Sequence, residues 1–165
     1  MIRPEEVPDV FVIDGSWRDL YVLDTTVEDW KEMLRLVRDR KTIDYQFTTD
    51  GEAAAIPQDL EPVFISDEAV FTNNARLPWS LVINLDGLGL TCLFFEDTEI
   101  EFHLDPRELN ENRFFELLDF LESLGRRLKR DVLLTPENRS YDPIVKYDAK
   151  HDRIVKVPEE LRKRD

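Results

Sequence analysis

Three residues whose side chains could bind a metal ion or transfer a proton, Glu99, Glu101 and His103, alternate with apolar residues in one short stretch. On a β-strand this spacing places all three on one face, with about 7 Å between successive side chains. Two carboxylates and an imidazole could hold a divalent cation or perform acid–base catalysis. Any strand with one solvated face shows the same alternation, however, and metal sites usually draw their ligands from several elements. The stretch therefore favours a solvated strand face, with a metal-assisted hydrolase that uses Glu99, Glu101 and His103 as the alternative.

The other residues capable of chemistry give weaker signals. Cys92 is the only cysteine, which excludes an internal disulfide, and its place in an apolar strand predicts a buried, inert thiol. His151 lies among charged residues at a predicted hairpin tip, where a histidine is usually exposed to solvent. Asp86-Gly87-Leu88-Gly89 resembles half of a phosphate-binding loop, but a strand follows it, so we predict a hairpin turn. No serine lies in a G-x-S-x-G motif. We therefore predict no catalytic residue and no cofactor, and a role other than catalysis is favoured.

Charge is distributed unevenly along the chain, whose net charge is −14. Residues 1–125 hold 28 acidic and 10 basic residues, a net charge of −18, whereas residues 126–165 hold 8 acidic and 12 basic residues, a net charge of +4. Between residues 42 and 106 there are 13 acidic residues and one basic residue, Arg76. Such a field repels nucleic acid and anionic membranes and attracts basic proteins. The simpler interpretation is that the acidic surface keeps the protein in solution.

A basic protein partner is the first functional hypothesis. Large aromatic side chains at strand or loop ends can anchor a partner, although they can equally close a core. The residues predicted to bind the partner are Trp79 as the anchor, with Asp86, Glu96, Asp97, Glu99 and Glu101 as the source of the negative field.

The basic run at residues 126–130 suggests two further interpretations. It either compensates the dipole of the helix that it ends or docks on the acidic middle of a second copy, which would make the protein a self-associating structural component. In size, acidity and absence of a catalytic signature, the chain resembles bacterial immunity proteins, which neutralise a toxin by covering its basic active site. That resemblance is one of composition, and it implies an inhibitor that binds protein.

The hydrophobic pattern predicts an α+β fold in which two helices pack on one face of a mixed, mainly antiparallel sheet. Three antiparallel strands (79–85, 90–95 and 99–104) and a helix (112–128) form its centre. The other predicted elements are a strand hairpin (10–13 and 18–23), a helix starting at Thr25 or Thr26, short strands at 43–47, 63–65, 69–71 and 132–134, and a final hairpin (144–147 and 153–157). Residues 53–56 could be a helical turn or part of a loop.

Several local features accompany this pattern. A capping box begins the first helix, with Thr25 and Glu28 or with Thr26 and Asp29. Gly125 either ends the second helix or is carried through it, and we favour the latter because Leu128 continues the apolar stripe. We expect one domain over residues 1–165, with poorly ordered ends at 1–8 and 159–165. Without a signal peptide or an apolar run of about 20 residues, a cytoplasmic location is expected.

Overall fold

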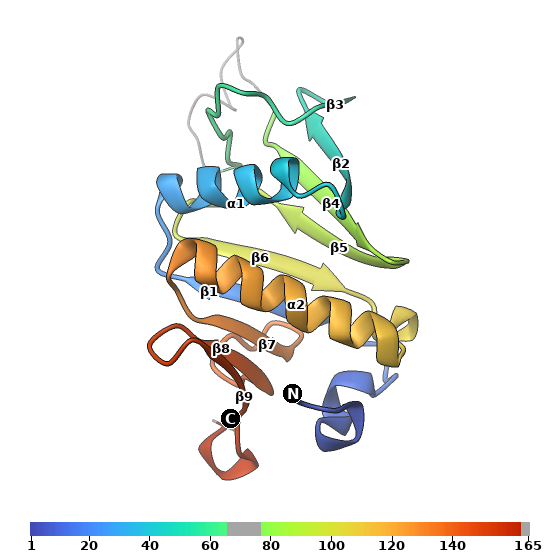
Figure 1. Ribbon diagram of the computed structural model, residues 1–165. Coiled ribbons are helices and arrows are strands. Elements are labelled where there is room, and N and C mark those ends of the chain that lie inside the picture. The colour runs from blue at the N-terminus through green and yellow to red at the C-terminus, as the bar shows by residue number, and fades with distance from the viewer. Residues whose placement is uncertain (66–76, 163–165) are drawn as a thin grey trace.

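The computed structural model describes residues 1–65 and 77–162 and contains one nine-stranded sheet with two α-helices on one face (Figure 1). The strands follow one another across the sheet in the order β3-β2-β4-β5-β6-β1-β7-β8-β9. Their bounds are β1 Arg18–Leu23, β2 Asp44–Thr49, β3 Glu52–Ala54, β4 Ser80–Leu85, β5 Leu88–Leu93, β6 Glu99–Leu104, β7 Val132–Pro136, β8 Val145–Asp148 and β9 Arg153–Lys156. The helices are α1 Val27–Asp39 and α2 Glu111–Leu128. The predicted α+β class and mainly antiparallel sheet are confirmed.

Every pair of neighbouring strands in the sheet is antiparallel. The first strand of the chain, β1, lies in the interior of the sheet between β6 and β7. Helix α1 therefore carries the chain from β1 to β2, four places away, and α2 carries it from β6 over β1 to β7. The two helices run antiparallel to each other across the same face (Figure 1).

Both helices begin at side-chain caps that the sequence indicates. In α1 the Thr26 side chain accepts a hydrogen bond from the Asp29 N–H, and the Asp29 carboxylate accepts one from the Thr26 N–H. This decides between the two predicted capping boxes. In α2 the Asn110 side chain accepts a hydrogen bond from the Arg113 N–H. These caps use backbone donors that have no partner inside the helix, so they fix where each helix starts.

Gly125 lies inside α2, as predicted, and the helix continues to Leu128. A Cβ atom at this position would overlap the ring of Tyr147 on β8. Glycine therefore lets the helix approach β8 closely, which offsets its low helix propensity of about 1 kcal/mol relative to alanine. The close packing of α2 on the sheet depends on this residue.

The core lies between the helices and the sheet and is rich in aromatic side chains. At one end Trp30 of α1 packs against Phe64 and Phe94, with ring centroids 5.1 and 4.4 Å away. Further along, Phe102 of β6 meets Phe120 of α2 edge-to-face at 5.6 Å. These contacts join both helices to the middle of the sheet.

The predicted strand at residues 10–13 is wrong, and so is the hairpin that it was to form. Residues Pro8–Phe11 form a 3-10 helix, η2. Both edges of β1 are already paired, with β6 and with β7, so no edge remains for a further strand. The Asp9 carbonyl instead accepts a hydrogen bond from the buried Arg18 guanidinium.

The two ends of the chain, for which we expected poor order, form short 3-10 helices and make a few contacts with the rest of the molecule. Residues Pro4–Glu6 form a 3-10 helix, η1, and Val7 and Val10 are buried. Residues Glu159–Leu161 form another, η5, and Arg162 contacts the carboxylates of Asp9 and Asp142. Val7 at one end and Arg162 at the other thus make contacts with the body of the protein. Residues 163–165 lie outside the described part.

Other short elements differ in detail from the prediction. Residues 52–54 form β3 as a hairpin with β2, because Asp50 and Gly51 both adopt the positive φ that a tight turn needs. Residues 63–65 are not a strand, although the Ile65 N–H donates to the Phe94 carbonyl. The predicted strand at 69–71 falls outside the described residues. Within the described residues, neither helix has the length and apolarity needed to cross a bilayer.

Candidate functional site

The face of the sheet turned away from the helices carries the residues that could do chemistry. Along β6 the side chains of Ile100, Phe102 and Leu104 are buried, and they alternate with partly exposed Glu99, Glu101 and His103. Alternating residues of a strand point to opposite faces, so Glu99, Glu101 and His103 share the face opposite the helices, as predicted. We call it the open face.

Two residues of β1 complete a polar cluster on the open face. In the register of the β1–β6 pair, Asp19 lies opposite His103 and Tyr21 lies opposite Glu101. His103 Nδ1 is 2.9 Å from Asp19 Oδ1 and 3.9 Å from Glu101 Oε1. The Tyr21 hydroxyl donates to Glu101 Oε1 and lies 3.3 Å from Asp19 Oδ2. We refer to these four residues as the Asp19 cluster.

Asp19 is 0 % exposed, so its charge has to be balanced inside the protein. The hydrogen bond from His103 supplies part of this balance, and the Asn138 N–H supplies more by donating to Asp19 Oδ2 at 2.7 Å. Asn138 belongs to the turn after β7, with φ of 57°. The cluster therefore joins two neighbouring strands and a turn that follows a third.

The environment of the cluster raises the pKa values of His103 and Tyr21. The hydrogen bond to Asp19 raises the pKa of His103, the negative charges of Glu101 and Glu137 raise it further, and burial opposes them. Burial raises the pKa of Tyr21, and the carboxylates of Glu101 and Asp19 add to the effect. Tyr21 therefore stays protonated at neutral pH and acts as a hydrogen-bond donor, while the imidazolium form of His103 is favoured.

The structure changes the set of residues that could bind a metal. Glu101 and His103 come together as the sequence suggested, but Glu99 is replaced by Asp19, which the sequence did not single out. The reason is the strand register, in which Glu99 faces the apolar Leu23. An acidic residue directly before the largely apolar residues 20–23 of β1 was the available signal, but the local sequence does not indicate which strand pairs with it.

A second group on the open face combines apolar and acidic side chains. Val82, Leu93 and Phe95 are 37, 40 and 43 % exposed. Val82 pairs with Thr91, and Leu93 lies two residues further along the same face of β5. Burial raises the pKa of Glu99, and the neighbouring carboxylates of Glu101 and Glu96 raise it further. We call Val82, Leu93, Phe95, Glu96 and Glu99 the acidic–apolar patch.

Two further residues predicted to bind a partner, Asp86 and Asp97, lie far from each other. Asp86 precedes β5 and Asp97 follows it, and six residues at about 3.3 Å each separate them by roughly 20 Å. The Asp97 side chain is exposed, but its carbonyl accepts hydrogen bonds from the side chains of Thr25 and Trp30. Asp86 and Asp97 thus lie at opposite ends of the sheet.

Trp79 cannot serve as the predicted anchor. Its side chain is 2 % exposed and packs edge-to-face on Phe47, with ring centroids 4.9 Å apart. A large aromatic residue at a strand end can close a core instead of binding a partner, and Trp79 closes this one. Trp17 and Tyr141, by contrast, are each 42 % exposed.

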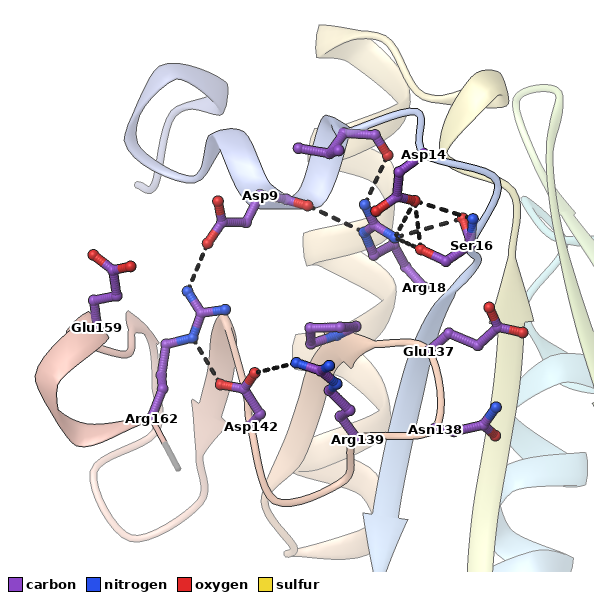
Figure 2. A pocket seen from close by; sticks show the side chains of 12 residues that line it. Asp9, Asp14, Ser16, Arg18, Glu137, Asn138, Arg139, Asp142, Glu159 and Arg162 are labelled. Atoms are coloured by element: carbon purple, nitrogen blue, oxygen red, sulfur yellow. Dashed lines mark hydrogen bonds and ion pairs between the residues drawn. The ribbon is translucent and has the colours of Figure 1, made fainter. Parts of the chain in front are cut away.

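A charged pocket of about 640 Å³ lies at the end of the sheet where the two ends of the chain meet (Figure 2). Arg162 bridges Asp9 and Asp142, at 2.7 and 2.9 Å. The Arg18 guanidinium donates to main-chain oxygens, including those of Val12 and Trp17. These two arginines are thus engaged in holding the chain together.

The turn after β7 connects this pocket to the Asp19 cluster. The side chains of Glu137 and Asn138 line the pocket (Figure 2). Glu137 accepts a hydrogen bond from the Trp17 N–H at 3.1 Å, and the Asn138 N–H reaches Asp19. Asn138 therefore belongs both to the lining of the pocket and to the hydrogen bonds of the cluster.

The basic run at residues 126–130 is engaged mainly within the molecule. Arg126 pairs with Asp152 and Glu122, Arg127 with Glu32, and Arg130 with Asp29. These contacts tie the end of α2 to α1 and to the turn between β8 and β9. Because three of its arginines are paired within the molecule, the run has less positive charge to offer to the acidic middle of a second copy.

No protein family matches this chain. No curated protein and no solved structure matches it either. Function is therefore inferred from the contacts and charges described above.

Proposed function

We propose that the protein binds a basic protein partner through the acidic–apolar patch on its open face. The observation that carries the proposal is the crowding of Glu96, Glu99 and Glu101 beside exposed Val82, Leu93 and Phe95. In the described residues no ion pair involves Glu96 or Glu99. A cationic side chain from a partner would relieve this repulsion.

The two components of the patch would contribute differently to binding. The apolar side chains offer surface whose burial favours association by about 25 cal/mol per Å². The carboxylates would mainly speed the encounter and select against acidic partners. Because the charges are exposed, the association rate should fall as salt screens them.

An inhibitor that covers the basic active site of another protein is the form of this function that we favour. The net charge of −14 supports it, because such a field steers basic surfaces toward the patch. We further propose that it acts in the cytoplasm. The lone thiol of Cys92 is buried, and burial raises its pKa, so the protein contains no cysteine suited to an oxidising compartment.

The test begins with affinity capture from an extract of the source cells at low salt, followed by kinetic measurements on the captured protein. Two variants with the same change in charge are compared. Glu99→Lys lies in the patch, and Glu116→Lys lies at an exposed position of α2 on the helical side. We expect Glu99→Lys to lower the association rate at least about tenfold and Glu116→Lys to leave it within about twofold.

Two outcomes would contradict the proposal. One is that no partner is captured at low salt. The other is that Glu99→Lys and Glu116→Lys weaken binding equally, which would place the contact elsewhere or leave only a general charge effect.

A further inference from the structure

We infer that Asp19, Glu101 and His103 form a binding site for one divalent transition-metal cation, of the kind represented by Zn²⁺ or Mn²⁺. This site would join β1 to β6 on the open face. It shares Glu101 with the carboxylates that we propose to attract the partner, but its other two ligands, Asp19 and His103, take no part in that proposal.

The spacing of the three side chains fits a single ion. Each offers one ligand atom, and these atoms lie within 4.8 Å of one another. His103 Nδ1 is 2.9 Å from Asp19 Oδ1 and 3.9 Å from Glu101 Oε1. Ligands about 2.05 Å from a tetrahedral ion are separated by roughly 3.3 Å, a value between these two distances. Two of the three separations therefore lie on either side of the value expected for a single ion.

The chemistry of the donors narrows the choice of ion. One imidazole nitrogen and two carboxylate oxygens suit zinc and manganese, whereas magnesium and calcium prefer oxygen ligands alone. The side chain of His103 is 27 % exposed, so water can reach the site and fill the remaining coordination positions. Cys92 is fully buried and faces the core, so it cannot compete as a ligand.

Groups around the cluster hold the ligands in place. The Tyr21 hydroxyl donates to Glu101, and the Asn138 N–H donates to the outer oxygen of Asp19, leaving Oδ1 directed at the imidazole. Such outer donors orient the carboxylates of metal sites, and their removal typically weakens metal binding by 10–100-fold. The carboxylates of Asp19 and Glu101 are thus oriented by hydrogen bonds that do not require a bound ion.

In the metal-free protein a proton occupies the place of the ion. The carboxylate of Asp19 can only accept a hydrogen bond, so His103 Nδ1 carries the hydrogen between them. A metal bound at Nδ1 must displace this proton, which goes to solvent when the ring is an imidazolium. The acidic groups facing the ring are Asp19, Glu101 and Glu137.

The chain contains a matched control in its second histidine. His151 Nδ1 lies 2.7 Å from the Asp148 carboxylate, but the pair is at an exposed turn and, among the residues that the structure describes, has no third ligand. Glu99 provides another control, because it shares the strand and the face with the cluster without being part of it. The His151 control thus shows whether any histidine–carboxylate pair binds the ion, and the Glu99 control shows whether any nearby carboxylate affects binding.

The experiment is calorimetric titration of Zn²⁺ and of Mn²⁺ into untagged protein that has been stripped with chelator. We expect one equivalent of at least one ion to bind and to raise the melting temperature. Asp19→Asn, Glu101→Gln and His103→Gln should each weaken binding by at least about 30-fold. His151→Gln and Glu99→Gln should change it by less than about threefold.

Three results would overturn the inference. They are absence of binding of both ions to the wild-type protein, retention of binding in both Glu101→Gln and His103→Gln, and loss of binding in His151→Gln. Circular dichroism of each variant shows that it is folded, and Glu101→Gln and His103→Gln, at partly exposed positions, keep the test valid if Asp19→Asn does not fold.

Discussion

The same strands form both faces of the sheet, but the face under the helices, which we call the covered face, differs from the open face in composition and in role. In β6, Phe102 is fully buried under α2, whereas its neighbours Glu101 and His103 meet Tyr21 and Asp19 across the open face. The covered face removes apolar surface from water and holds the fold together. The open face keeps charged groups close enough to shift the pKa of His103 and that of Glu99. Adjacent residues of one strand thus serve different roles, because one points to the core and the next to the open face.

The comparison predicts that substitutions of the covered face have the largest effects on stability. Phe102→Ala should lower the free energy of unfolding by about 4 kcal/mol, because it leaves a cavity beside Phe120. Urea denaturation at pH 7 measures this change. The matched substitution on the open face is Thr91→Ala, opposite His103, which should cost less than about 1 kcal/mol. Equal losses would show that both faces contribute equally to stability.

The contact between α2 and β8 comes next in size. Gly125→Ala should lower the free energy of unfolding by about 2–3 kcal/mol, because the added methyl group overlaps the Tyr147 ring. In a double-mutant cycle, Tyr147→Ala should remove most of this loss by making room. If the two losses simply add, the helix does not approach the sheet as closely as described.

On the open face, Asp19→Asn should lower the free energy of unfolding by about 2 kcal/mol near pH 6. The raised pKa of His103 means that its contribution is fully present below its unfolded pKa of about 6.5 and is lost as pH rises through the folded pKa. The loss caused by Asp19→Asn should therefore shrink at higher pH. NMR titration should show the pKa of His103 falling in the variant, and an unchanged pKa would remove Asp19 as its cause.

The smallest effect is expected at Glu99, and its sign is reversed. Because the pKa of Glu99 is raised, its ionised form opposes folding once pH exceeds that pKa. Glu99→Gln should stabilise the protein at pH 7 by less than about 0.5 kcal/mol, since solvent screens the carboxylate. The gain should vanish at pH 3, where wild-type Glu99 is protonated. Destabilisation at pH 7 would reveal a favourable contact of Glu99.

The covered face was largely readable from sequence, whereas the open face was not. The apolar spacing in Glu111–Leu128 and the alternation in Glu99–Leu104 placed α2 and β6 almost to the residue, because burial imposes periods of 3.6 and 2. Asp19 could not be joined to His103, because their register depends on pairing two segments 84 residues apart. Trp79 was misplaced since its type suits both a core and an interface.

The interior position of β1 also bears on the order in which the protein assembles. Its neighbours in the sheet are β6 and β7, so residues 18–23 have no strand to pair with until residues 99–104 and 132–136 have been synthesised. During translation this apolar stretch must wait, exposed, for most of the chain to leave the ribosome. Closure of such long loops slows folding and leaves unpaired strands open to aggregation. The pairing of this interior strand of the sheet is thus completed only late in synthesis.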